Sequence, residues 1–269
     1  MTTTSLIQRR LSVEQLRTLV TSAPHEPAGL HDVQRASFTQ HLRGVAHPGH
    51  RRLDAWTVEH ARQAPRVFRW TPAAARRTIG NASLRRAQLE ATALPDALDR
   101  EIVLRRARAA AGYARPGSLD HWLDTQAPAV LTLVRAEALT WIATLVECTR
   151  GLALPWAVVT SDAYYDLAGA RTTLRGRRDV VVVPDERRIV VRLRPGQPGR
   201  FAGTGLRVDL LVDSLTEAST PAAARIIGLW PEAGVALAVD GTLENLRAAA
   251  RALVRAAAVQ PPRVVHQAA

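Results

Sequence analysis

The chain has 269 residues, and all 36 of its basic side chains are arginines, set against 24 aspartates and glutamates, for a formal net charge of +12. The absence of lysine excludes Schiff-base catalysis and the lysine-bearing phosphate loop. The surplus of guanidinium groups, which fork onto phosphate oxygens, indicates a polyanionic partner.

Bulk composition indicates a globular protein of a reducing compartment. Hydrophobic residues make up 47% of the chain, and Cys148 is its single cysteine, so no intramolecular disulfide can form. The apolar stretch 127–148 is interrupted by Arg135, Glu137 and Glu147, which favours a core helix over a membrane span. No secretory signal is recognised, so we expect a cytoplasmic protein without a membrane partner.

The N-terminal region, residues 1–117, is predicted to be all helical. A helix should follow Ser12, which has the capping-box spacing to Gln15, and further helices are expected over about 30–42 and 53–63, with Trp56 facing inward. Ten arginines against two acids lie between residues 43 and 86, the density of a polyanion-binding surface. A solvated face of an arginine-rich protein is the alternative interpretation.

A helix-turn-helix outline lies within this basic block. Thr71-Pro72 predicts a helix start, Gly80-Asn81 a stop, and Ser83 the start of a second helix. Six residues are therefore candidates for nucleic-acid binding: Arg69, Trp70, Arg76, Arg77, Arg85 and Arg86.

Three more helices are predicted next, and after them the sequence pattern changes from helical to strand-like. Helices are expected over 95–111, from Ser118, and over 128–149, with 113–117 as the domain boundary. The last of these has an apolar stripe formed by Leu131, Val134, Leu139, Ile142 and Leu145. Short β-branched runs at 157–160, 171–174, 179–183 and 188–193 then predict strands, followed by a helix over 205–217, strands at 226–230 and 235–239, and a helix over 242–259.

This order predicts an α+β protein in which an all-helical N-terminal region precedes a mixed β-sheet flanked by helices. The expected divisions are a helical, arginine-rich region over 1–117, an α/β domain over 118–260 and a flexible tail over 261–269.

Two short motifs extend this interpretation. Leu174-Arg-Gly176-Arg-Arg-Asp179 has the form of a Gly-x-x-Asp turn, and Arg192-Leu-Arg194-Pro-Gly196 follows after a hairpin. With the element order over 128–259, they resemble the PD-(D/E)xK nuclease superfamily, particularly its RecB-like branch. The resemblance implies a restriction-endonuclease-like core in which two acids hold divalent cations and a lysine orients the attacking water.

The resemblance also implies that the metal chemistry is lost. Asp179 matches the first acid, but Arg192 replaces the second acid and Arg194 the lysine, while Glu137 could stand for an acid on the preceding helix. A guanidinium in place of a ligand makes a poor magnesium site but a plausible phosphate cradle, so Arg192 and Arg194 join the nucleic-acid-binding candidates. The alternatives are that Asp179 simply pairs with Arg177 or Arg178, and that Arg192 and Arg194 lie on the solvent face of an edge strand.

No confident catalytic residue, metal site or cofactor is predicted; Asp179 and Glu137 are the weak catalytic candidates. His47 and His50, with His41 and His60 nearby but no cysteine partner, form a poor zinc pattern. The favoured hypothesis is a non-catalytic nucleic-acid-binding protein, with DNA the expected partner. One alternative is a magnesium-dependent nuclease that uses Asp179, Glu137 and Asp166, and another is a protein–protein adaptor.

Overall fold

The computed structural model describes residues 5–7, 13–24, 30, 32–45, 51–61, 69–149, 156–167, 171–216 and 222–259. Two compact units divide the chain. The helical unit comprises residues 65–150 with 157–160, and the sheet unit comprises 1–64, 151–156 and 161–269. The predicted loop at 46–50 and the predicted tail at 261–269 lie outside the described residues.

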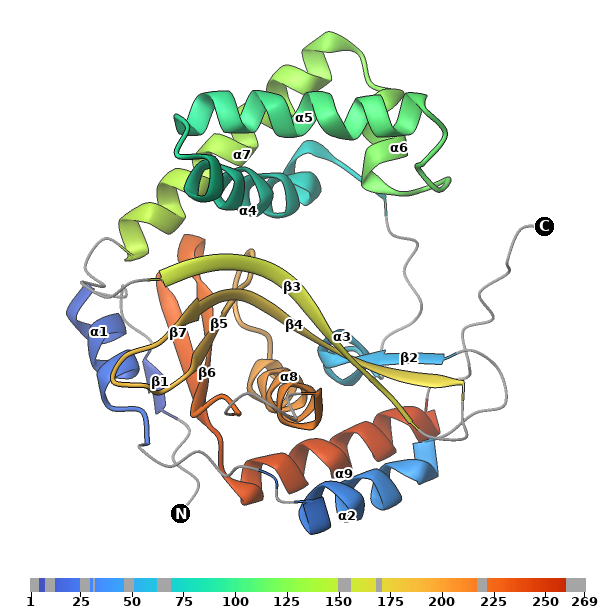
Figure 1. Cartoon of the computed structure of the whole chain (residues 1–269), viewed down its shortest axis with the longest axis vertical. Coiled ribbons are helices and arrows are strands. Elements are labelled where there is room, and N and C mark those ends of the chain that lie inside the picture. The colour runs from blue at the N-terminus through green and yellow to red at the C-terminus, as the bar shows by residue number, and fades with distance from the viewer. Residues whose placement is uncertain are drawn as a thin grey trace. The chain divides into compact units, whose positions relative to one another are not determined.

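The helical unit contains helices α4 (Pro72–Glu90), α5 (Leu94–Ala110), α6 (Leu119–Asp124) and α7 (Pro128–Thr149) (Figure 1). The predicted start of α4 is confirmed, because the Thr71 hydroxyl accepts a hydrogen bond from the Ala74 amide at 3.1 Å. The apolar stripe of α7 is also confirmed: Val134, Ile142 and Leu145 are buried. Leu131 and Leu139, which belong to the same stripe, pack against the core of this unit.

The predicted helix-turn-helix is wrong, because α4 runs without a break through Gly80 and Asn81. Gly80 allows a close approach of two helices: a Cβ there would lie 2.8 Å from Cδ1 of Trp141 on α7. The Asn81 carboxamide accepts a hydrogen bond from the Trp141 indole at 2.9 Å. The two residues therefore lock α4 against α7 and form no turn.

Length and composition alone would let one described helix, the Pro128–Glu147 part of α7, cross a membrane. Core helices of soluble proteins share both features. Here α7 packs against α4 and buries Trp141 within the helical unit.

The described residues form a mixed, seven-stranded sheet, as the predicted fold class requires, and all of it except residues 157–160 belongs to the sheet unit. Its strands are β1 (Ser5–Ile7), β2 (Arg51–Asp54), β3 (Trp156–Asp166), β4 (Thr172–Val182), β5 (Ile189–Leu193), β6 (Arg225–Trp230) and β7 (Val235–Asp240). Their order is β1-β7-β6-β5-β4-β2, and β3 pairs with β4. Strands β4 and β5 are antiparallel, whereas β5 and β6 are parallel and connected through α8 (Ala202–Thr216).

One strand takes the place of the predicted Gly-x-x-Asp turn. β4 continues through Gly176 and Asp179, joining the two short strands expected at 171–174 and 179–183. Gly176 is required by packing, since a Cβ there would lie 3.0 Å from Cβ of Val212 on α8. The glycine lets α8 lie close to the sheet.

The N-terminal segment is not all helical, which corrects the prediction. Helices α1 (Val13–Thr21) and α2 (Asp32–Leu42) occur where expected, but β1 pairs with β7 and β2 pairs in parallel with β4. These pairings place residues 1–64 in the sheet unit, so the observed division of the chain differs from the expected boundary at residue 117.

The expected helix over 53–63 is instead the end of β2 followed by the short α3 (Ala55–Glu59), which Asp54 caps by accepting from the Thr57 amide at 2.9 Å. Leu53 takes the core position on β2. Trp56, predicted to face inward, is 41% exposed and stacks on the His60 ring at 4.6 Å.

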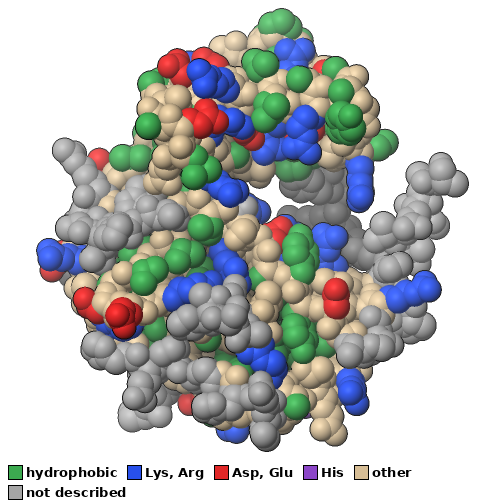
Figure 2. Space-filling view, viewed as in Figure 1, with side chains coloured by type: hydrophobic (Ala, Val, Ile, Leu, Met, Phe, Trp, Pro, Cys, Tyr) green, Lys and Arg blue, Asp and Glu red, His purple; other side chains and the backbone are tan. Residues whose placement is uncertain are grey.

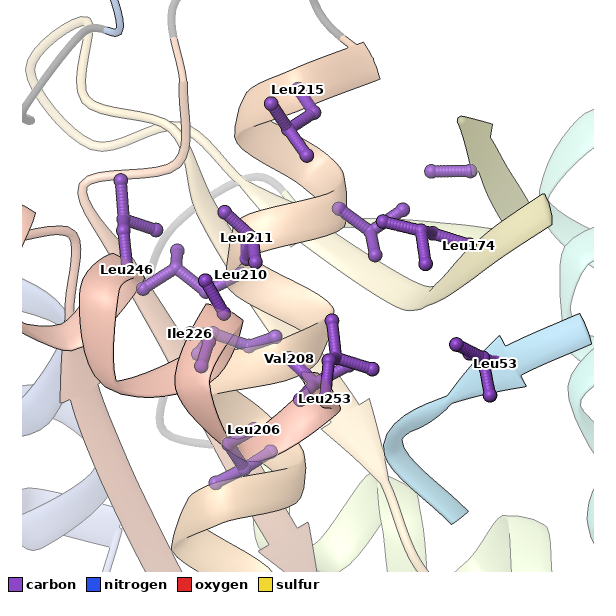
Figure 3. Close-up of a cluster of buried hydrophobic side chains, with 14 of the residues drawn as sticks. Leu53, Leu174, Leu206, Val208, Leu210, Leu211, Leu215, Ile226, Leu246 and Leu253 are labelled. Carbon is purple, nitrogen blue, oxygen red and sulfur yellow. The ribbon is translucent and has the colours of Figure 1, made fainter. Parts of the chain in front are cut away.

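Helix α8 is the centre of the main core. It packs against β4 and β6 on one side and against α9 (Leu243–Val259) on the other, and α9 in turn packs against α2 (Figure 1). Figure 3 shows Leu206, Leu210 and Leu211 of α8 among side chains from strands and from α9. Because α8 is covered on opposite sides, residues 208–215 are all buried, and the polar side chains among them need partners inside the protein.

Candidate functional site

Asp179 on β4 lies at the centre of a buried group of charges. Its side chain has no exposed surface. Oδ1 accepts a hydrogen bond from Arg177 Nε at 2.9 Å. Oδ2 accepts from Arg192 Nε at 3.3 Å and from the Leu193 backbone amide at 2.9 Å. Both carboxylate oxygens are therefore occupied by donors of the protein itself.

Asp209 on α8 faces the same guanidinium. Its Oδ1 accepts from the Arg177 backbone amide at 3.2 Å, and its Oδ2 accepts from Arg192 Nη1. Burial raises the pKa of Asp209 to about 6, against the lowering effect of Arg192 and Arg194. Burial lowers the pKa of Arg192, but the charges of Asp209 and Asp179 more than offset it, so that pKa lies above its usual value. Arg192 thus stays charged and bridges two carboxylates.

Arg194, the residue directly after β5, forms a second ion pair. Its Nη1 donates to Glu59 Oε1 at 2.7 Å, and its Nη2 donates to Oε2 of the same carboxylate. The guanidinium also lies over the Trp230 ring, 5.7 Å from its centroid. Gly205 on α8 makes room for this pair, because a Cβ there would lie 1.8 Å from Glu59 Oε1.

These side chains form one arginine–carboxylate cluster: Glu59, Arg177, Asp179, Arg192, Arg194 and Asp209. Its three guanidinium groups balance its three carboxylates. The side chains of Arg192 and Arg194 are only 8% and 17% exposed. The structure thus places both predicted phosphate-binding arginines in internal ion pairs. Among the described residues, no group of three or more potential metal ligands occurs.

A second buried carboxylate follows one turn along α8. Asp213 accepts from Arg178 Nε at 2.7 Å, from Arg188 Nη1 at 2.7 Å and from the Ala223 amide at 3.3 Å. Neither Asp209 nor Asp213 was predicted as part of the site. The available signal was their four-residue spacing within a helix otherwise rich in leucine and valine, where a charged side chain is buried and must be paired.

Most of the predicted nucleic-acid-binding residues of the helical unit also have protein partners. Arg76 Nη1 donates to Glu137 Oε2 at 3.0 Å, and Arg86 pairs with Glu90 and Glu101 at 2.7 and 3.1 Å. Glu137, a weak catalytic candidate, therefore lies in an ion pair of the helical unit, whereas Asp179 belongs to the sheet unit.

The remaining predicted residues of this unit differ in exposure. The Trp70 indole donates to the Gly117 carbonyl at 3.0 Å and is half-buried, as is Arg77. Arg69 and Arg85 are exposed. Exposed arginines are the ones that can reach a partner without breaking an ion pair.

The other polar candidates have local roles. Asp166 is exposed and accepts from the Thr173 hydroxyl at 2.6 Å. His60 stacks on Trp56, and its Nδ1 lies 2.9 Å from the Trp56 carbonyl oxygen. His47 and His50 lie outside the described residues.

Comparison with known proteins assigns no relative: no family model, no curated protein and no solved structure matches this chain.

Proposed function

We propose that this chain is a non-catalytic DNA-binding protein whose nuclease-like sheet unit has a buried guanidinium in place of metal chemistry. The observation that carries the proposal is the position of Arg192, which bridges Asp179 and Asp209. A divalent cation needs free carboxylate oxygens, and the hydrogen bonds to Asp179 occupy both of its oxygens. The cluster therefore supports a structural role for these residues.

The order of elements along the chain supports the nuclease-like part of the proposal. Helix α7 is followed by β3, β4 and β5, then α8 and β6, the order on which the resemblance to PD-(D/E)xK nucleases was based. Asp179 lies on β4, although without the predicted turn at Gly176, and Arg192 and Arg194 lie on or just after β5.

The DNA-binding part rests on the net charge of +12 and on how the arginines are distributed. Buried carboxylates are matched by arginines within the protein, as in the arginine–carboxylate cluster. Other arginines reach the surface, and Figure 2 shows several of them in blue on the face it draws. Guanidinium groups at a surface attract phosphate and fork onto its oxygens.

A salt titration of affinity tests this proposal. Purified protein is titrated with duplex DNA, single-stranded DNA and RNA of equal length. Log affinity should fall linearly with log salt, by about 0.9 per phosphate contact on duplex and about 0.7 on single strands. A flat plot, or no binding to any of the three at low salt, would contradict the proposal.

The nuclease alternative makes a different prediction. It requires cleavage that depends on Mg²⁺ or Mn²⁺ and is lost when Asp179 is replaced by asparagine. Arg192 would have to leave the two carboxylates for a cation to enter, at the expense of its buried ion pairs.

The adaptor alternative is favoured by one observation. The helical unit exposes large apolar side chains: Leu89, Val103, Leu104, Tyr113, Leu133 and Val146. Exposed apolar groups on a folded unit can mark a protein-binding surface. If they do, replacing Val103 and Leu104 with serine would release the partner and leave affinity for DNA unchanged.

A further inference from the structure

The exposed face of α9 has a row of arginines. Arg247, Arg251 and Arg255 are all exposed and are spaced four residues apart. Residues four apart on a helix share a face and are separated by about 6 Å along its axis. No ion pair or hydrogen bond in the described part of the chain involves these three side chains, which we call the α9 arginine row.

The opposite face of α9 holds the row in a fixed orientation. Leu246, Ala249, Ala250 and Leu253 are buried in the main core, and Figure 3 shows Leu246 and Leu253 there. Such a helix cannot roll without exposing these side chains. Since its apolar face is already buried, α9 also cannot insert that face into a lipid bilayer.

Hydrogen bonds fix both ends of the helix. Near its start, Arg207 of α8 donates to the Asn245 side chain at 3.0 Å, and the Asn245 amide group donates to the Asp240 carbonyl at 2.9 Å. Near its end, Arg51 donates to the Ala257 carbonyl at 2.7 Å. The row therefore projects from a rigid support, which lowers the entropy lost when a partner is bound.

The surroundings of the row are positive. Helix α9 has one acidic residue, Glu244, in its first turn. The neighbouring 3-10 turn η1 (Arg43–Val45) packs against α9 and exposes Arg43. Helix α2 has one acidic residue, Asp32 at its start, and η1 has none. Across α2, η1 and α9, five arginines therefore stand against two acids.

We propose that the α9 arginine row is the surface through which the sheet unit contacts the phosphate backbone of duplex DNA. This inference rests on the proposed function and gives it a contact surface that the sequence analysis did not identify. The row extends over about 12 Å of helix axis, comparable to a few base-pair steps at about 3.4 Å each. Planar guanidinium groups suit phosphate oxygens, and contacts of this kind position a protein on DNA without selecting a sequence.

The test compares two variants with the same change in charge. The row variant is Arg247→Gln with Arg251→Gln and Arg255→Gln. The matched control is Arg17→Gln with Arg171→Gln and Arg200→Gln, three exposed arginines from separate parts of the sheet unit. Circular dichroism and urea unfolding are used first to check that both variants fold like the wild type.

Binding to a duplex is then measured over a range of salt concentrations. The row variant should lose at least about tenfold in affinity at low salt, and its log–log salt slope should fall by about 2.7, or 0.9 for each lost contact. The control should change the slope by less than about 1. Equal losses in both variants, or a row variant that binds like the wild type, would overturn the inference while leaving the proposed function intact.

Two further probes separate other partners. Vesicles containing phosphatidylserine, and polyglutamate at equal charge concentration, should bind more weakly than duplex DNA. Tighter binding to either, lost in the row variant, would assign the row to a membrane surface or to an acidic protein and overturn the inference. If the wild type fails to bind duplex at low salt, the proposed function falls together with the inference.

Discussion

At the scale of single residues, the geometry of Asp179 explains how a charged group is tolerated in the middle of a sheet unit. Three donors from Arg177, Arg192 and Leu193 satisfy its two oxygens. A buried ion pair contributes little net stability compared with apolar packing, but losing one partner leaves the other charge buried and unpaired. An intact pair and a pair that has lost one partner therefore differ by several kcal/mol in stability, so truncating Asp179 should have a large effect.

Replacing Asp179 with alanine should therefore destabilise the protein by about 3–5 kcal/mol, because Arg177 and Arg192 lose their shared carboxylate. The free energy of unfolding in urea measures this. Asp166→Ala is the matched control and should change stability by less than about 0.5 kcal/mol, since Asp166 is exposed. An Asp179→Ala variant as stable as the control would show that the cluster has no structural role.

Asp209 should make stability depend on pH. Its pKa in the folded protein is about 6, above the ordinary value of 3.8, because burial disfavours the ionised form. The folded state therefore binds the proton more tightly than the unfolded state does. The stability that Asp209 contributes by holding this proton is fully present below its ordinary pKa of 3.8. It is lost as pH rises through about 6, by up to about 3 kcal/mol.

Asp209→Asn removes this titration while keeping the shape of the side chain. The measurement is the difference in unfolding free energy between wild type and Asp209→Asn at several pH values from mildly acidic to neutral. The wild type should lose stability relative to the variant as pH rises. Parallel pH profiles would mean that Asp209 does not titrate in this range.

At the scale of elements, Gly80 shows that a glycine inside a helix can be required by packing against a second helix. In α4 it sits against Trp141 and Ile142 of α7, and Asn81 accepts the Trp141 hydrogen bond. Alanine is the better helix former by about 1 kcal/mol, so propensity alone would favour Gly80→Ala. The added methyl group would, however, overpack the contact between α4 and α7, because the hydrogen bond to Asn81 keeps Trp141 from moving aside.

Gly80→Ala should lower the free energy of unfolding by about 1–3 kcal/mol. Gly203→Ala is the same change in α8, where the new Cβ would lie 3.4 Å from Leu237 Cδ2 in ordinary contact. That variant should gain about 0.4–1 kcal/mol. The free energies of unfolding of both variants in urea are compared with that of the wild type. A Gly80→Ala variant more stable than the wild type would refute the packing explanation.

The sequence predicted most elements because their periodicity is local. The strands after residue 171, helix α8 and the buried stripe of α7 all follow from patterns within a few residues. Gly80 and Gly176 misled the prediction because a glycine needed for close packing looks the same in sequence as a glycine needed for a turn. Strand β2 was missed because its partner β4 lies far along the chain.

The site was harder to predict for the same reason. Asp179, Arg192 and Arg194 were identified from motifs, and Arg177 was weighed as a partner of Asp179, which the structure confirms. The partners Asp209 and Glu59 come from α8 and α3, and no local pattern links them to β4 or β5. The α9 arginine row was visible as a four-residue spacing, but only the buried opposite face shows that it points outward.

At the scale of the whole molecule, charge is used in two ways. Within the sheet unit, arginines are paired with carboxylates and hold α8 and α3 to the strands. On the exposed face of α9 they have no carboxylate partner among the described residues. The proposed function links these two uses: the Arg192 guanidinium would take the place of a nuclease's cation, and surface arginines would supply the contacts to phosphate.

The most direct test of that account measures affinity for one duplex at matched ionic strength, once with EDTA and once with Mg²⁺, while the DNA is checked for cleavage. The account predicts binding that is salt-dependent but equally tight within about twofold with and without the cation, and intact DNA throughout. Binding or cleavage that appears only with Mg²⁺ or Mn²⁺, and is lost in Asp179→Asn, would contradict it.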